Sequence, residues 1–140
     1  MKDVLVNVVG TQEYGDQSDA VELTTRGKFY EDPVHYFIEY EEAQEDGTAS
    51  VHVCVKVKKD LSAVQTNRTG AGTSELLIES GRRNCCQYAT EYGDMLIGIH
   101  GKRVDAAVEE NGGTFEFLYA IDMNGSEVSS NKVLITFKEN

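Results

Sequence analysis

Tryptophan is absent from this 140-residue sequence, and proline occurs once. No stretch approaches the roughly 18 apolar residues that a membrane-spanning helix needs, and the amino terminus has no apolar run of signal-peptide length. These absences argue against a membrane protein and against a secreted one, so we expect a cytoplasmic protein. Low-complexity tracts and candidate linkers are lacking too, and residues 1–140 are expected to form a single domain.

Positive charge is also scarce. Thirteen Lys and Arg residues stand against 24 Asp and Glu residues, which gives a formal net charge of −11. A surface of this sign repels phosphate backbones and anionic lipid headgroups. We therefore expect neither nucleic acid nor a membrane surface as a partner.

Cysteine and histidine are too few and too scattered to indicate a metal centre. The three cysteines, Cys54, Cys85 and Cys86, are an odd number with two adjacent, which suits neither a disulfide framework nor a zinc ligand set. The three histidines are isolated, without the spacing that places two imidazoles on one metal. No serine lies in a nucleophile elbow. The sequence thus predicts no catalytic residue, no metal and no cofactor.

Alternation of apolar and polar residues is what the sequence has in abundance. The clearest example is residues 51–58, where a valine occupies every second position. This is the period of a β-strand with one face turned to a core. The pattern returns in residues 4–8, 21–26, 34–41, 76–78, 95–99, 115–123 and 133–137. Residues 82–90 and 103–110 are assigned to strands as well.

Short clusters rich in Gly, Asn and Asp separate these runs. Tyr14-Gly15-Asp16, Gly101-Lys102 and Asn124-Gly125 are examples, and such residues supply the positive φ or the side-chain caps of tight turns. Strands joined by such short turns form hairpins in a meander, and closing the sheet removes its exposed edges. We therefore predict an all-β fold, an antiparallel meander closed into a β-barrel of about 8–10 strands.

A barrel of this size has room for packed side chains or for one small ligand. Arg68 is the first candidate for a ligand contact, because a charged group inside a barrel needs a carboxylate from the protein or from a ligand. A structural ion pair or an outward-facing arginine are the alternatives, and both stay open. Tyrosines could line a cavity with apolar rings and hydroxyl tips or simply fill the core. These candidates are Tyr36, Tyr40, Tyr88 and Tyr119.

Several short motifs occur in a familiar order: Arg68-Thr69-Gly70, Ser80-Gly81, Tyr88-Ala89-Thr90-Glu91-Tyr92-Gly93 and Tyr119-Ala120-Ile121-Asp122. Their order and spacing resemble the YwiB-like family of uncharacterised bacterial proteins. The resemblance implies a calycin-like β-barrel akin to lipocalins and fatty-acid-binding proteins. It implies no activity, and without tryptophan the lipocalin Gly-x-Trp signature is missing.

The leading hypothesis is a cytoplasmic barrel that binds a small apolar or amphipathic ligand in its interior. The first alternative is a protein-interaction module or homodimer that uses an exposed strand edge or an aromatic patch. The second is an enzyme whose site is assembled inside the barrel from residues far apart in sequence.

Overall fold

The computed structural model describes residues 1–42, 50–70, 73–90 and 93–140, and for residues 73, 74, 86–90, 94 and 95 it describes the backbone alone. Ten strands follow one another along the chain. They are β1 (Lys2–Tyr14), β2 (Gln17–Glu31), β3 (His35–Glu42), β4 (Val51–Lys58), β5 (Ala63–Thr69), β6 (Thr73–Glu79), β7 (Arg83–Thr90), β8 (Gly93–Glu109), β9 (Gly112–Met123) and β10 (Ser126–Glu139). None of the described segments forms a helix that could traverse a lipid bilayer.

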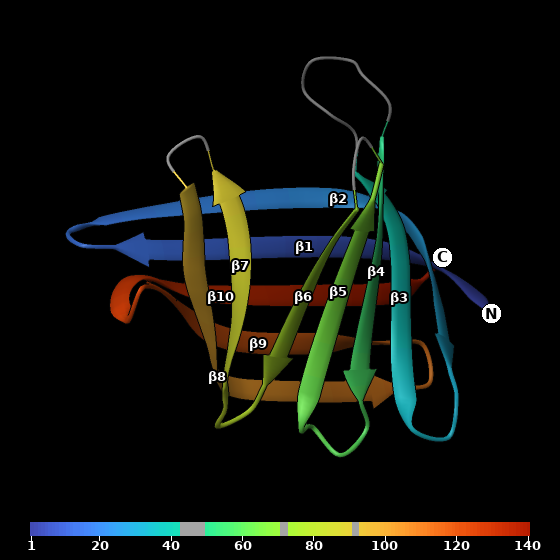
Figure 1. The fold of residues 1–140 in the computed structure, drawn as a ribbon. Helices are drawn as coiled ribbons and strands as arrows, with labels where there is room; N and C mark the ends of the chain where they lie inside the picture. The colour runs from blue at the N-terminus through green and yellow to red at the C-terminus, as the bar shows by residue number, and fades with distance from the viewer. Residues whose placement is uncertain (43–49, 71–72, 91–92) are drawn as a thin grey trace.

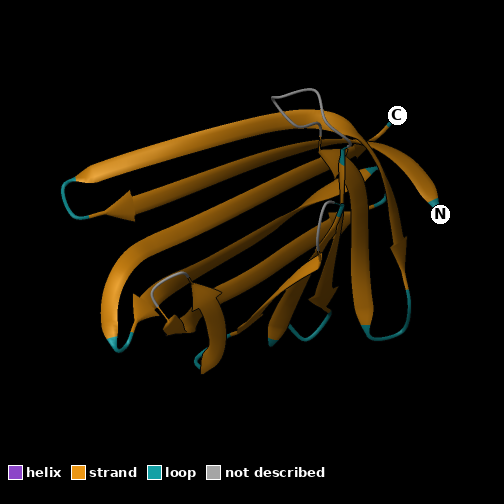
Figure 2. Cartoon of the chain, turned by 45° about the horizontal axis from the view of Figure 1, so that its top comes forward, coloured by secondary structure: helices purple, strands orange, loops and turns teal. Residues whose placement is uncertain are grey.

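All ten strands belong to one antiparallel sheet in the order β6-β5-β4-β3-β2-β1-β10-β9-β8-β7. Apart from β6 and β7, which are the two edges of the sheet, strands that follow each other in sequence pair with each other, and the β1–β10 pair joins the two ends of the chain. In Figure 1 the long strands β1, β2, β8, β9 and β10 cross behind the shorter strands β3 to β6, and Figure 2 shows the same sheet wrapped around a common interior. The predicted all-β antiparallel meander is therefore confirmed, and it forms a nearly closed barrel.

The turns between strands obey the local chemistry of the sequence. Gly15 after β1 and Gly81 after β6 have φ of 60° and 78°, and the Asn124-Gly125 turn has φ of 52° and 91°. Positive φ at both central residues gives the turn the twist that antiparallel strands require, which explains why Asn-Gly occurs there. The turns at Gly15 and at Asn124-Gly125 were predicted from the sequence.

The barrel is closed at the turn between its two edge strands, β6 and β7. Ser80 forms a parallel bridge to Gly101 of β8. The Gly81 N–H donates to the Gly101 carbonyl at 2.9 Å, and the Gly101 N–H donates to the Arg82 carbonyl at 2.9 Å. Away from this turn, the described backbone of β6 and that of β7 form no ladder with each other. Among the described residues, the backbone hydrogen bonds that close the barrel therefore lie at this turn.

The predicted turn at Gly101-Lys102 is wrong, because β8 continues through it. The register between β8 and β9 shifts between Gly101 and Arg103, which marks a β-bulge. A bulge bends a strand without ending it. Here the bend lies where the β6–β7 turn packs against β8, and Gly101 lets the two backbones come close together. The predicted strands at 95–99 and 103–110 are therefore parts of one strand.

An aromatic cluster fills one end of the barrel. Phe137 stacks on Phe29 with ring centroids 4.8 Å apart, and Phe115 lies 5.2 Å from Phe137 and 6.0 Å from Tyr36. Phe115 is completely buried. Most of the remaining core is aliphatic, since the inward positions of β3, β4 and β6 carry Ile38, Val53, Val55, Val57 and Ile78.

Candidate functional site

A cavity of about 390 Å³ lies inside the barrel, next to the aromatic cluster. On β9, Phe115 belongs to the cluster, whereas Phe117 and Tyr119, further along the same face, line the cavity. The apolar lining consists of Val8, Gly10, Val55, Leu76, Ile99, Phe117, Val133 and Ile135, and the polar lining of Tyr40, Thr66, Arg68, Glu75 and Tyr119. The short strands β3 to β6 and the long strands β1, β8, β9 and β10 all contribute residues, so the cavity lies between these two groups of strands.

Arg68 points into the barrel. It lies opposite Val53 in the β4–β5 ladder, and paired residues of neighbouring strands share a face. Because Val53 is completely buried, the side chain of Arg68 starts from the inner face. Its Nη2 donates to Oε2 of Glu42 at the end of β3. The side chain is 42% exposed, which puts this ion pair at the mouth of the cavity.

Tyr40 and Tyr119 both line this cavity. Burial raises the pKa of Tyr40 to about 12, with the negative charge of Glu42 adding to the shift and Arg68 opposing it. Burial also raises the pKa of Tyr119. No other described residue hydrogen-bonds to either hydroxyl. Both phenols are therefore protonated at neutral pH, and each hydroxyl can donate or accept a hydrogen bond.

The other two candidate tyrosines are not brought to this site. Tyr36 stacks in the aromatic cluster, with Nζ of Lys59 5.1 Å from its ring centre, so it fills the core and does not line the cavity. Its place on β3 explains this, because it lies on the same face as Tyr40 but toward the other end of the barrel. The backbone of Tyr88 pairs with Met95, and its side chain lies outside the described residues.

Sequence reasoning missed Thr66, Gly10 and Glu42. Thr66 precedes Arg68 by two positions and therefore shares its face, which alternation would have shown once Arg68 was placed inward. Gly10 lies on the inner face of β1 opposite Val133. A Cβ built on it would meet no atom within 4 Å, so this glycine leaves part of the cavity empty. Glu42 is the end residue of a strand, and no local signal joins it to Arg68.

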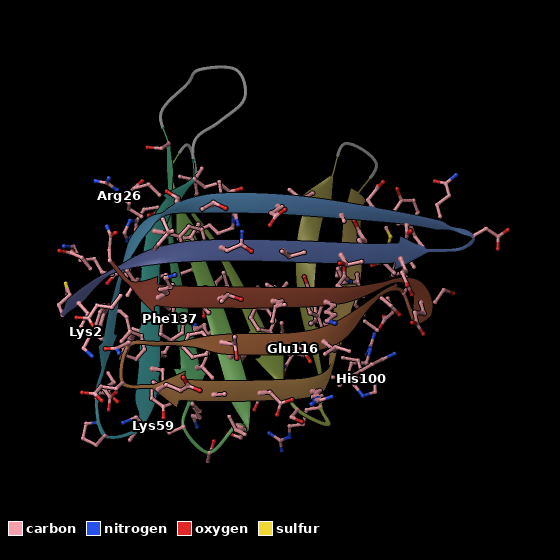
Figure 3. All side chains as sticks on the ribbon, turned by 180° about the vertical axis from the view of Figure 1, so that it is seen from behind. Lys2, Arg26, Lys59, His100, Glu116 and Phe137 are labelled. Carbon is pink, nitrogen blue, oxygen red and sulfur yellow. The ribbon has the colours of Figure 1, made fainter. Side chains whose placement is uncertain are left out.

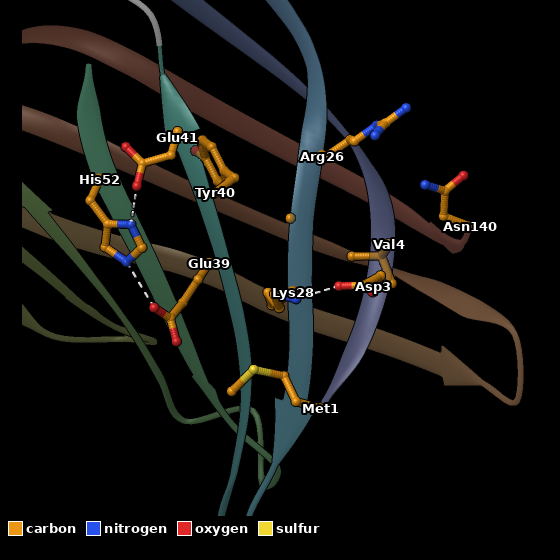
Figure 4. A pocket seen from close by; sticks show the side chains of 11 residues that line it. Met1, Asp3, Val4, Arg26, Lys28, Glu39, Tyr40, Glu41, His52 and Asn140 are labelled. Carbon is orange, nitrogen blue, oxygen red and sulfur yellow. Dashed lines mark hydrogen bonds and ion pairs between the residues drawn. The ribbon is translucent and has the colours of Figure 1, made fainter. Parts of the chain in front are cut away.

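A second hollow of about 600 Å³ lies on the outside of the barrel (Figure 4). His52 lies between two carboxylates, with Nδ1 2.7 Å from Oε1 of Glu41 and Nε2 2.7 Å from Oε1 of Glu39. On the neighbouring strands Lys28 is paired with Asp3. These charged groups are paired with one another, whereas the interior cavity offers hydrogen-bonding groups without partners among the described residues. We therefore take the interior cavity as the candidate site.

Because two carboxylates flank His52, the pKa of its imidazole tests whether these ion pairs form in solution. Hydrogen bonds to Glu41 and, to a lesser degree, Glu39 raise the pKa of His52 above its ordinary value of 6.5. Protonated His52 then stabilises the fold fully below about pH 6.5, and this contribution is lost as the pH rises through the higher folded-state pKa. The side chain is 41% exposed, so solvent screening keeps the effect below about 1 kcal/mol.

We expect an NMR titration of the His52 imidazole to give a pKa above 6.5 in the intact chain and a lower value in Glu41→Gln. Glu13→Gln removes an equal charge from an exposed position on β1 and serves as the control. An unchanged titration curve in Glu41→Gln would show that the pair does not form in solution.

The part of the chain that forms the cavity matches a recognised protein family. A family described as "Domain of unknown function (DUF1934)" matches residues 6–135, from β1 to β10. The chain belongs to this family. Among curated proteins none matches the DUF1934 chain.

One solved structure resembles the DUF1934 chain over almost its whole length. It is the crystal structure of the ywiB protein from Bacillus subtilis, with a TM-score of 0.79 and 21% sequence identity. The match covers 99% of this chain and 92% of that one. The predicted resemblance to the YwiB-like family is therefore confirmed. At this level of identity the likeness establishes the fold, and the use of the DUF1934 cavity has to be argued from its own residues.

Proposed function

We propose that this protein is a cytoplasmic binding protein that holds a small amphipathic molecule in the barrel cavity. The observation that carries the proposal is the lining, in which Tyr40 and Tyr119 stand among mostly apolar side chains. Ligand sites are typically concave and mostly apolar, with a few placed polar groups and volumes of roughly 300–1,000 Å³. The cavity, at about 390 Å³, lies within this range.

The charges at the mouth favour an uncharged ligand. Arg68 is already compensated by Glu42. An acidic ligand would have to displace Glu42 from Arg68, and the displaced carboxylate would lose a charge-assisted hydrogen bond. A hydroxyl or carbonyl group, by contrast, pairs with a neutral phenol at no such cost. We therefore infer a largely apolar ligand with one or two uncharged polar groups.

Native mass spectrometry of freshly purified protein tests the proposal, followed by titration with an uncharged environment-sensitive fluorophore. We expect either a co-purified small molecule or saturable binding of the fluorophore at one site per chain. A chain that carries no extra mass and binds no fluorophore would overturn the proposal.

Gly10→Val should block the cavity without harming the fold. The new side chain would enter the space that Gly10 leaves open, so we expect at least a tenfold loss of fluorophore affinity, about 1.4 kcal/mol. Glycine within a strand costs roughly 0.5–1 kcal/mol relative to alanine, so thermal unfolding should show equal or greater stability.

Thr11→Val is the matched control, because Thr11 is the next residue on β1 and faces the opposite side of the sheet. It should leave fluorophore affinity unchanged. Equal binding by the Gly10 and Thr11 variants would place the ligand site outside the barrel cavity.

A further inference from the structure

One half of β2 has an unpaired edge. β2 pairs with β1 from Gln17 to Phe29, but it pairs with β3 only from Gly27 to Glu31. Within the described chain, residues 17–26 therefore have a strand partner on one side only. Figures 1 and 3 show this half of β2 along the rim of the molecule, with β1 on its other side. Val21, in the middle of this edge, is 70% exposed.

This edge lacks the devices that usually prevent strand addition. Proline, a bulge or projecting charges commonly protect an edge strand. Residues 17–26 contain no proline or glycine, and their register with β1 is continuous. The acidic side chains are turned back toward β1, since Tyr14 donates a hydrogen bond to Asp19 and Asn7 donates to Glu22 at 2.9 Å. The backbone groups of the edge are left available for a ladder.

We propose that a second copy of this chain pairs with this edge, antiparallel and two-fold symmetric, with Val21 opposite Val21 at the axis. A two-fold antiparallel pair places one residue opposite its own copy, and the middle of the free edge offers Val21 or Glu22. Centring on Glu22 would set two carboxylates against each other, which is unfavourable. Centring on Leu23 would bring the second copy against Gly27, where β3 is already paired.

The Val21 register also matches charge with charge. It places Arg26 at one end of the free edge opposite Asp16 of the second copy, and symmetry repeats the pair at the other end. Both residues are exposed. Between them Glu22 faces Ala20 of the second copy, and Thr24 faces Ser18. No like charges meet, so a chain with a net charge of −11 gains two local attractions where the copies touch.

Charge reversal tests the register. Sedimentation equilibrium of the full chain in about 0.15 M salt, where long-range repulsion is screened beyond roughly 8 Å, should show a dimer. Arg26→Asp alone and Asp16→Arg alone each create two repulsive pairs, and each should raise the dimer Kd at least tenfold. The double variant restores opposite charges and should regain dimerisation.

Lys138→Asp is the control. It makes the same change of charge as Arg26→Asp at an exposed position of β10, and it should dimerise like the parent chain. A monomeric parent chain, or single reversals that behave like Lys138→Asp, would overturn the proposal.

A cysteine at the axis gives a second readout that does not depend on affinity. Paired Cα atoms in an antiparallel ladder lie about 4.5–5.5 Å apart, within the usual disulfide range. Val21→Cys should therefore form a covalent dimer on oxidation beyond the level of the parent chain, whereas Glu22→Cys should not. The reverse result would reject this register.

Discussion

Phe115→Ala should lower the free energy of unfolding by about 3–5 kcal/mol, the range for removing a buried aromatic ring. Phe115 has no exposed surface, and on β9 it lies between Ala106 of β8 and Ile135 of β10. Its ring contacts Phe137 and Tyr36, so the substitution removes the centre of the aromatic cluster. The adjoining cavity would be enlarged as well.

Urea unfolding followed by circular dichroism measures this loss, and Phe37→Ala is the matched control. Phe37 lies on the outer face of β3, where its ring stacks on Tyr30 at 4.6 Å. Phe37 is half-buried and lies outside the core, so its replacement by alanine should lower the free energy of unfolding by about 1 kcal/mol. Equal losses for the two phenylalanines would mean that the cluster does not hold the barrel together.

Alternation is a local signal, and it predicted the strands well. In residues 51–58 every valine faces inward, as β4 shows with Val53, Val55 and Val57 buried. The Asn-Gly and Gly turns are equally local, because positive φ is a property of the residue itself. Strand number, meander order and the all-β class therefore followed from short stretches of sequence.

The site could be predicted only in part, because it depends on register. Shifting a strand by one residue moves every side chain to the other face. Arg68 became an inward residue only when its pairing with Val53 was known. Its partner Glu42 lies 26 residues away on β3, and β4 lies between the two strands. Tyr40 and Tyr119 meet at the cavity from β3 and β9, which no local pattern connects.

The misassigned turn at Gly101 has the same origin. A glycine followed by a lysine between two alternating runs is typical of a hairpin turn. In the fold, the reason for the glycine is a contact with residues more than twenty positions earlier in the chain. A Cβ on Gly101 would lie 2.1 Å from the carbonyl oxygen of Glu79 and 2.7 Å from its carbonyl carbon. The sequence shows a glycine, and only the closed barrel shows why it is needed.

Gly101→Ala should therefore destabilise the barrel by about 2–3 kcal/mol, because the added methyl meets rigid backbone and the turn must move away. The amides of Gly81 and residue 101, which hydrogen-bond across this closure, should exchange with solvent faster relative to core amides. Urea unfolding and amide hydrogen exchange measure the two effects.

Gly10→Ala is the control, since a Cβ there meets no atom within 4 Å and should leave stability equal or slightly higher. If Gly101→Ala matched it in stability and exchange, the contact between the β6–β7 turn and β8 would not be what closes the barrel. If the fast exchange stayed confined to this contact, closure would be a local event on an otherwise stable sheet. That behaviour is expected where an isolated bridge from Ser80 to Gly101 of β8 closes a sheet whose edge strands form no ladder in the described part of the chain.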